Sequence, residues 1–431
     1  MRKVVLAVLV LLLAASLVFA GGSKESKKDD GTVTLRIAWW GSQKRHDATL
    51  AVLDLYTKLT GVQFEAEFLP FDGYFTKLNT LAAANDVWDI YQLGSNFPNY
   101  ADSLEPLDPY IKSGAIDVSQ IGNGILATTR LNGNGNLLGI SIGTNTYGIA
   151  YDPEMFKKAG VPEPTENWTW ADYENACLKI HEKLGVFGSS KLDDFISGAS
   201  IRVPQHDKNQ SLFKSDGTGL GYTDDYPLID YWTIRKNLVD AGAYPDPGRI
   251  NEIKDIESDY LVRGEAAMTF VASNQFIALC NAAKRPLKMA VLPRESKTSD
   301  LAVTMQSSQQ FGVYSGSKHK EEAAKFISFF VNNIDANRIL QGERGVPVST
   351  PVRNDLETYL QDDSQKELLS FMTIMSRQAG VENNFDVPCQ DEIKDLYWRI
   401  EDQVVFGKLT PTEAAKQFRA EAEAIFKKTL R

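Results

Sequence analysis

Apolar strands and helical patterns alternate near the start of the chain, and this alternation restricts the fold more than any other sequence feature. The strands are expected at 33–39, 62–69 and 88–93, and the helices between them at 47–59 and 74–84. A β-α-β-α-β order predicts right-handed crossovers and a largely parallel sheet. The carboxyl ends of the three strands then meet at one edge, where open α/β sheets bind ligands. The loops at that edge begin at Trp40, Phe71 and Gly94.

Strand-loop-helix units appear again after residue 142, although the chain has no internal sequence repeat. One long extended run, 142–151, separates the two sets and is the best candidate for a crossing between lobes. A chain of 431 residues is long enough for two separate cores. The pattern therefore predicts an α/β protein with two lobes that face each other.

The N-terminus has the pattern of a secretory signal peptide. Arg2-Lys3 precede an uncharged apolar run that is shorter than a membrane-spanning helix, and Ala20 ends a small-x-small cleavage site. We expect a signal peptide over 1–20, a flexible charged tether over 21–31, and a mature protein in the periplasm or at the cell surface of a bacterium. No cysteine follows the cleavage site, so the bacterial lipid-anchor pattern is missing.

Composition argues against several functional classes. The formal net charge of −10 disfavours nucleic acid as a partner. Three widely spaced cysteines and four histidines have no metal-ligand spacing, so we expect neither a metal nor a cofactor. The sequence contains no His-Glu-x-x-His and no Gly-x-Ser-x-Gly motif.

Several stretches together carry a family resemblance, although each is weak alone. They are 35–41, 87–90, 147–160 with Thr169-Trp170 after it, 263–268, 311–326 and 345–348. In this order and spacing they resemble the extracellular solute-binding proteins of ATP-driven sugar importers, the family 1 group related to maltose-binding protein. Trp39-Trp40-Gly41 with Arg45-His46 is similar to a subgroup that includes oligogalacturonide-binding proteins.

The resemblance implies a two-lobe periplasmic binding protein fold with a hinge and an interlobe cleft. The N-terminal lobe would comprise 32–143 plus 309–346, and the C-terminal lobe 144–308 plus 347–431. Such a protein does no chemistry; as a monomer it captures a carbohydrate and delivers it to the membrane permease subunits of an ABC importer. We expect an oligosaccharide as the ligand, with a uronate-containing one as a narrower hypothesis.

Candidate ligand contacts in the N-terminal lobe lie at the edge where the parallel strands end. Aromatic faces pack on the C–H surfaces of sugars, and planar polar side chains bind hydroxyls. Trp40 is the expected platform, whereas Trp39 points to the opposite face of its strand and is expected in the core. Arg45 has the guanidinium geometry that grips a uronate. The other candidates here are Ser42, His46, Tyr74, Gly94 and Asn96.

Further candidates lie at the expected hinge and in the C-terminal lobe. They are Thr144, Asn145, Trp168, Trp232, Asn274, Gln306 and Ser307. For Trp170, which follows a helix cap, and for Trp398, which lies on a C-terminal helix, we expect packing rather than ligand contact.

An exported glycosidase or polysaccharide lyase is the main alternative function. A hydrolase needs two carboxylates across the scissile bond, and Asp and Glu are plentiful enough for such a pair. A binding protein for a peptide, a phosphate or a metal is a third possibility, with metal disfavoured by the scarcity of histidine.

Overall fold

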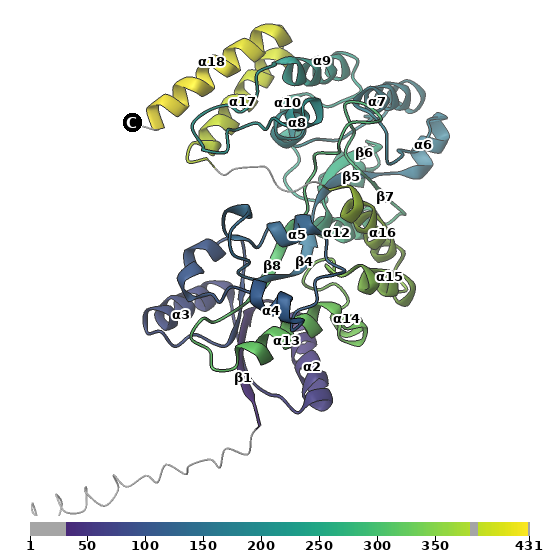
Figure 1. The fold of residues 1–431 in the computed structure, drawn as a ribbon. Helices are drawn as coiled ribbons and strands as arrows, with labels where there is room; N and C mark the ends of the chain where they lie inside the picture. Colours follow the sequence, from purple (N-terminus) through teal and green to yellow (C-terminus); the bar gives the residue numbers. More distant parts are fainter. Residues whose placement is uncertain (1–31, 380–386, 430–431) are drawn as a thin grey trace, which may run out of the picture.

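The computed structural model describes residues 32–379 and 387–429, which form two lobes joined by several chain segments (Figure 1). This mixed α/β architecture with two sheets confirms the expected fold class. The expected signal peptide and tether, 1–20 and 21–31, lie outside the described residues. Within the described ranges, no helix has the length and apolar character needed to cross a membrane.

A five-stranded sheet forms the centre of the lower lobe in Figure 1. Its strands are β1 (Thr34–Trp40), β2 (Gln63–Leu69), β3 (Ile90–Leu93), β4 (Ile140–Asn145) and β8 (Gln306–Val313). The strand order is β2-β1-β3-β8-β4. β1 pairs with β2 and with β3 in parallel, as the alternating pattern predicts. β8 joins this sheet from far along the chain and runs antiparallel to both β3 and β4.

The upper lobe contains a second, three-stranded antiparallel sheet in the order β6-β5-β7. Its strands are β5 (Tyr147–Tyr151), β6 (Met268–Ala272) and β7 (Lys288–Ala290). The extended run 142–151 therefore divides at Thr146, where the chain passes from one sheet to the other. β4 extends two residues beyond the predicted lobe limit at 143, to Asn145, and β8 begins three residues before the predicted limit at 309, at Gln306. The lobe limits themselves stay a prediction.

Helices surround both sheets (Figure 1). The α-helices are α2 (Gln43–Thr60), α3 (Phe71–Ala83), α4 (Asp108–Ser113), α5 (Asn123–Ala127), α6 (Pro153–Ala159), α7 (Trp170–Leu184), α8 (Arg202–His206), α9 (Tyr226–Asp240), α10 (Pro247–Ile250), α11 (Tyr260–Arg263), α12 (Phe276–Ala283), α13 (Lys320–Asn332), α14 (Ile334–Leu340), α15 (Thr350–Tyr359), α16 (Asp363–Gln378), α17 (Gln390–Val405) and α18 (Pro411–Thr429). Short irregular helical segments are η1 (Phe97–Ser103), η2 (Leu131–Gly133), η3 (Ile196–Ser200) and η4 (Ser273–Gln275).

Two helices at the end of the parallel strands begin earlier than the sequence predicts. α2 begins at Gln43 because the Ser42 hydroxyl accepts the N–H of Arg45 at 3.4 Å and caps the helix. α3 begins at Phe71, where the sequence predicts a turn over 70–73. Pro70 at the cap position lacks an N–H that would need a partner, and Asp72 lies in the positively polarised first turn.

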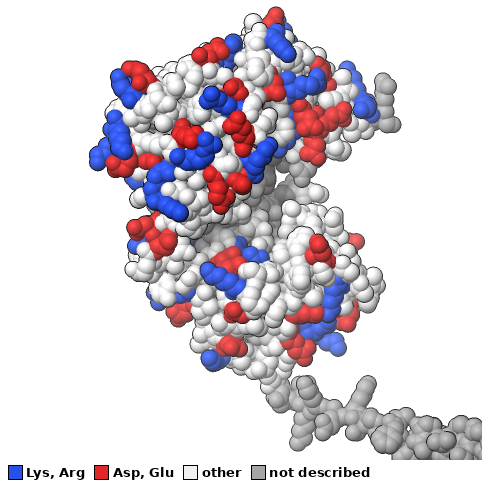
Figure 2. All heavy atoms as spheres, turned by 180° about the vertical axis from the view of Figure 1, so that it is seen from behind, with Lys and Arg blue, Asp and Glu red and all other residues white. Residues whose placement is uncertain are grey.

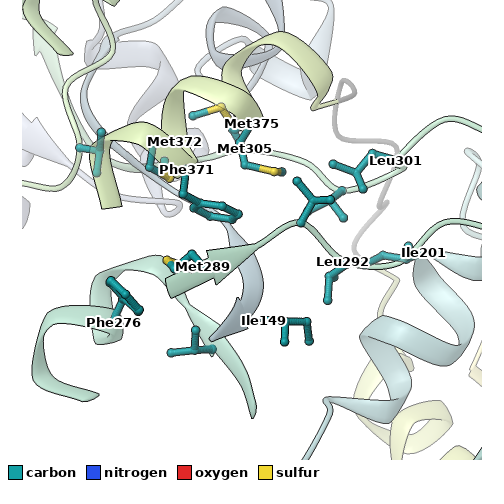
Figure 3. Packing of buried hydrophobic residues seen from close by; sticks show 14 of the residues in the cluster. Ile149, Ile201, Phe276, Met289, Leu292, Leu301, Met305, Phe371, Met372 and Met375 are labelled. Atoms are coloured by element: carbon teal, nitrogen blue, oxygen red, sulfur yellow. The ribbon is translucent and has the colours of Figure 1, made fainter. Parts of the chain in front are cut away.

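A methionine-rich core holds α16 against the second sheet (Figure 3). Phe371 and Met372 of α16 pack with Met289 of β7 and Ile149 of β5. The packing is closest at Gly148, where an added Cβ would lie 2.7 Å from the Phe371 ring. Contacts this close are typical of protein interiors. α16 is therefore part of the core of the upper lobe.

The strand register brings one end of each sheet to the crossing. Leu93 of β3 pairs with Gln310, and Asn145 of β4 pairs with Gln306, so the carboxyl ends of the parallel strands lie beside the start of β8. We call this end the first sheet edge. In the other sheet, Tyr147 at the start of β5 pairs with Ala272 at the end of β6. This second sheet edge and the first therefore flank Thr146 from opposite sides.

Candidate functional site

An aromatic cluster around Trp40 lies at the first sheet edge. The Trp40 ring centroid is 5.1 Å from that of Tyr74, 5.2 Å from that of Phe75 and 5.5 Å from that of Phe71. Trp40 is half-buried and Phe71 is 57% exposed, so the two rings form an aromatic surface beside the crossing. Sequence reasoning missed Phe71 because residues 70–73 have the composition of a turn.

Tyr74, Trp39 and His46 support this edge from within the core. The buried Tyr74 hydroxyl donates to the Gln92 carbonyl at 2.8 Å, and burial raises its pKa well above the ordinary value. Trp39 is buried, as expected, and its Nε1–H donates to Nδ1 of His46 at 3.0 Å. Burial, with the positive charges of Arg344 and Arg45, lowers the pKa of His46. The imidazole is therefore neutral at pH 7 and serves as an acceptor.

Four protein acceptors engage the guanidinium of Arg45. Its Nε lies 2.7 Å from Oε2 of Glu343, and the two side chains are 14% and 13% exposed. Its Nη1 donates to the Trp40 carbonyl at 3.3 Å and to Oε1 of Gln309 at 3.2 Å, and its Nη2 donates to the Glu343 carbonyl at 3.4 Å. Arg45 thus ties the start of α2 to Glu343, which follows α14 in the chain.

The buried Arg344 lies next to this pair and bonds neutral partners. It donates to the side chain of Gln92 and, at 2.8 Å, to Oγ1 of Thr49. Burial, followed by repulsion from Arg45, lowers the pKa of Arg344 to about 9. The positive charges at the first edge are therefore held by the protein itself.

The loop candidates at the first edge bond mainly to their own surroundings. Ser42 Oγ lies 3.4 Å from Oε1 of Glu343 while it caps α2. The N–H of Gly94 donates to Oδ1 of Asn96 at 3.3 Å, so the half-buried Asn96 side chain turns back on its loop. These residues share the edge with Trp40, as the parallel topology predicts.

The crossing itself contains one unsatisfied acceptor. Thr144 donates to the Val346 carbonyl through both its N–H, at 2.8 Å, and its hydroxyl, at 3.1 Å. Ser307 Oγ donates to Ser141 Oγ at 2.9 Å, and Gln306 pairs with Asn145 in the ladder. Oδ1 of Asn145 is buried and has no hydrogen-bond partner among the described residues.

In the upper lobe, two of the predicted tryptophans lie in the core. Trp168 is buried and its Nε1–H donates to the Val291 carbonyl at 2.8 Å. Trp232 is buried with its ring 5.0 Å from Tyr397 and 6.3 Å from Phe418. Asn274 instead lies exposed in η4, directly after β6 at the second sheet edge.

A cavity of about 550 Å³ opens at the second sheet edge, and its size is that of a small-molecule site. Tyr147 and Phe270 line it with rings stacked 5.2 Å apart, and Trp398 of α17 forms another part of the wall. Trp398 is 40% exposed, so the expectation that it packs in the core is wrong. Figure 2 shows, from behind, a hollow between the two lobes.

A buried charge cluster forms the inner wall of this cavity. Nε of Arg235 lies 2.9 Å from Oδ1 of Asp194 and 3.0 Å from Oε1 of Glu401. The Tyr231 hydroxyl donates to Asp194 at 2.6 Å. Burial and the neighbouring Asp194 raise the pKa of Glu401 well above its usual range. Sequence reasoning missed Arg235 and Glu401 because the cluster joins α9 to α17, which are far apart in the chain.

A smaller cavity of about 210 Å³ adjoins the second sheet edge and shares Lys191, Phe270 and Gln275 with the larger one. Cavities of about 530 and 750 Å³ surround α7, and none of their lining residues belongs to either sheet edge. Among the described residues, no group of three or more His, Cys, Asp or Glu side chains could hold a metal ion.

Two sheet edges that flank one crossing, each with aromatic rings and polar groups, define a two-lobe solute-binding protein. The model of the bacterial extracellular solute-binding protein family matches residues 42–336, which is more than half of the chain. The chain belongs to this family.

Solved structures and characterised relatives span nearly the whole chain. An extracellular solute-binding protein of family 1 from Alicyclobacillus acidocaldarius superposes with a TM-score of 0.79 at 26% identity, covering 92% of this chain and 98% of that one. A periplasmic oligogalacturonide-binding protein from Yersinia enterocolitica gives 0.73 at 22% identity, covering 93% and 100%, and its complex with saturated digalacturonic acid gives 0.61 with the same identity and coverage. The arabinooligosaccharide-binding protein of Bacillus subtilis is 24% identical over 422 residues, 92% of this chain and 90% of the relative.

Proposed function

We propose that this protein is the solute-binding component of an ABC importer and captures an oligosaccharide between its two lobes. The observation that carries the proposal is a pair of aromatic surfaces on opposite sides of Thr146. Trp40 and Phe71 form the surface at the first edge, and Trp398 with Tyr147 forms the one at the second. Aromatic faces on both sides suit a chain of sugar rings, whose C–H surfaces pack on them.

Unsatisfied polar groups and named relatives support a carbohydrate ligand. Oδ1 of Asn145 and Nη1 of Arg235 are both buried and both lack a hydrogen-bond partner within the described part of the chain. Sugar hydroxyls both donate and accept, so they suit an unsatisfied amide oxygen as well as an unsatisfied guanidinium. One relative by sequence is an arabinooligosaccharide-binding protein, and one solved structure with a similar fold is an oligogalacturonide-binding protein.

Capture proceeds by closure around the crossing. A ligand that contacts both edges stabilises the closed population by its differential affinity for that state. The TM-score with the Yersinia protein falls from 0.73 to 0.61 when digalacturonic acid is bound there, which supports a lobe arrangement in this chain that differs from that complex.

We assign the predicted contacts to two groups. Those that face the edges are ligand candidates: Trp40, Ser42, Gly94, Asn96, Asn145, Asn274, Gln306 and Ser307, joined by Trp398 and Tyr147. Those that are buried form the scaffold: Trp39, His46, Tyr74, Thr144, Trp168 and Trp232. Arg45 belongs to the scaffold as well, because protein acceptors engage its guanidinium.

The remaining parts of the proposal concern location and partners. The protein is exported by a signal peptide cleaved near Ala20, resides in the periplasm or at the cell surface, and acts as a monomer without catalysis. It releases its ligand to the membrane permease subunits of the importer. The lobes comprise 32–143 plus 309–346 and 144–308 plus 347–431.

Native mass spectrometry of the purified protein, followed by calorimetry with oligosaccharide digests of plant and storage polysaccharides, tests the proposal. We expect one ligand per chain and unchanged sugar after long incubation. Release of shorter sugars would instead support the glycosidase or lyase alternative. Failure of every carbohydrate to bind would exclude the carbohydrate class.

A further inference from the structure

The cavity at the second sheet edge has an uneven charge distribution. Four carboxylic acids contribute to its lining: Asp193, Asp194, Glu401 and Asp402. Two basic residues, Lys191 and Arg235, line it as well. The acidic and basic residues do not form one ion pair each. Which of them have ion-pair partners therefore decides whether the cavity accommodates a charged ligand.

Both basic side chains in the cavity lining already have a carboxylate partner. Arg235 bonds both Asp194 and Glu401, as described above. Nζ of Lys191 lies 3.8 Å from Oδ2 of Asp259. Nζ of Lys394 lies 4.8 Å from the centre of the Trp398 ring. An anionic ligand would therefore have to break an existing interaction to gain a cation.

Two of the carboxylic acids, by contrast, have no ion-pair partner among the described residues. Asp402 lies on α17 one turn after Trp398, and burial raises its pKa. Asp193 accepts the N–H of Ile196 at 3.1 Å, and burial raises its pKa although the charge of Lys394 opposes the shift. Burial is the first cause of both shifts, and the charges of Arg235 at Asp402 and of Lys394 at Asp193 oppose them without cancelling them.

Among the described residues of the wall, Arg235 has a buried donor without a partner. This residue is only 2% exposed, and its Nη1 has no hydrogen-bond partner in the described part of the chain. Its charge is already balanced by two carboxylates, so what Nη1 lacks is an acceptor oxygen rather than a counter-ion. A hydroxyl or ring oxygen of a sugar supplies that acceptor without adding charge.

We infer that the ligand of this protein is a neutral oligosaccharide and that the second sheet edge discriminates against uronates. Sugar hydroxyls donate to Asp402 and Asp193, and a sugar oxygen accepts from Arg235. A uronate carboxylate would face two carboxylates in a partly desolvated cavity, where like charges repel more strongly than in water. The inference rests on the proposed carbohydrate function and narrows its ligand.

The opposite edge does not compensate for this repulsion. Arg45, the residue that the sequence offers for a uronate, is bonded to Glu343 at 2.7 Å and to three further acceptors. A uronate could reach its Nε only by displacing Glu343, which would then lose its own partner. The guanidinium of Arg45 is therefore already committed to protein acceptors, and Arg344 beside it is only 2% exposed.

Calorimetry on the full mature chain separates the two ligand classes. The neutral arms are oligosaccharide digests of arabinan, starch and xylan, and the acidic arm is short oligogalacturonates at the same concentration and ionic strength. We expect one neutral arm to bind at least about tenfold more tightly than the oligogalacturonates, the effect of one unscreened like-charge contact. Oligogalacturonate binding of equal or greater strength would overturn the inference and leave the carbohydrate function standing. Absence of binding in every arm would overturn both.

A variant that removes the charge of Asp402 then tests whether this residue disfavours uronate binding. Asp402→Asn keeps the side-chain volume, and we expect it to reduce the neutral-to-acidic affinity ratio about three- to tenfold. Asp395→Asn is the matched control, since Asp395 lies on the same helix but not in the cavity wall. Asp395 is exposed and lies about two helical turns from Asp402. Thermal unfolding of both variants checks that they fold. An unchanged ratio in Asp402→Asn, or the same change in both variants, would refute the local charge effect.

Discussion

Removal of the Trp398 ring should weaken oligosaccharide binding and leave the fold intact. The side chain is 40% exposed in the cavity wall. Because a tryptophan carries roughly 250 Å² of surface, about 100 Å² is open to a ligand. Covering all of it at about 25 cal/mol per Å² corresponds to about 2.5 kcal/mol. A sugar ring covers only part of an indole, so we expect Trp398→Ala to lose about 1–2 kcal/mol, roughly a 5- to 30-fold increase in Kd.

Calorimetry with the oligosaccharide that binds the parent protein measures this loss. Phe406→Ala is the matched control: Phe406 ends the same helix, is 60% exposed and does not line the cavity, so its removal should leave Kd unchanged. Trp398→Phe should retain part of the affinity because it keeps an aromatic face. If Trp398→Ala bound sugar as tightly as the parent, the aromatic wall of the second edge would not be part of the site.

Three further predictions concern the scaffold and are measured by unfolding. Arg45→Ala should lower the free energy of unfolding by about 1–3 kcal/mol, because its part-buried carboxylate partner at 2.7 Å loses its counter-charge; parental stability in urea would contradict this. Gly143→Ala should cost at least about 2 kcal/mol, since the new Cβ would lie 2.2 Å from a backbone oxygen, whereas Gly73→Ala, with no atom within 4 Å of the new Cβ, should add about 0.5–1 kcal/mol. Equal thermal shifts in the two variants would refute the packing argument. Because the pKa of His46 is lowered in the folded protein, the imidazole is protonated in the unfolded chain at a higher pH than in the folded one. The contribution of His46 to the free energy of unfolding is therefore complete above about pH 6.5 and is lost as the pH falls below that value. The parent should therefore lose more stability than His46→Gln between about pH 7.5 and about pH 5.5, and parallel losses would exclude the effect.

Local patterns were sufficient to predict the first half of the lower lobe. Strands 33–39, 62–69 and 88–93 and their parallel pairing correspond to β1, β2 and β3, because the apolar runs and intervening helical periodicities are short-range signals. β8 could not be placed in this sheet from sequence, since its pairing with β3 joins segments more than two hundred residues apart. The α3 start at Phe71 was also missed, because a proline-aspartate-glycine composition favours a turn as readily as a helix start.

The candidate site divides in the same way. The edge containing Trp40 and Gly94 follows from the rule that parallel strands end together, whereas Asn145 was predicted from its place at the hinge. The cavity wall containing Arg235 and Trp398 depends on how α9 and α17 pack, and no spacing along the chain encodes that contact. The role of Arg45 changed for a similar reason, because Glu343 reaches it only after the chain returns to the first sheet.

The sequence by itself therefore determined the family, the α/β class, the crossing near Thr146 and the edge at which Trp40 lies. These properties depend on residue periodicity and on the order of motifs, which are written along the chain. Only the tertiary structure decided which aromatic rings are open to a ligand and which charges are uncommitted. Exposure and ion pairing depend on what packs against a side chain: Trp232 is covered by Tyr397 and Phe418, whereas Trp398, on the same helix as Tyr397, remains open in the cavity wall.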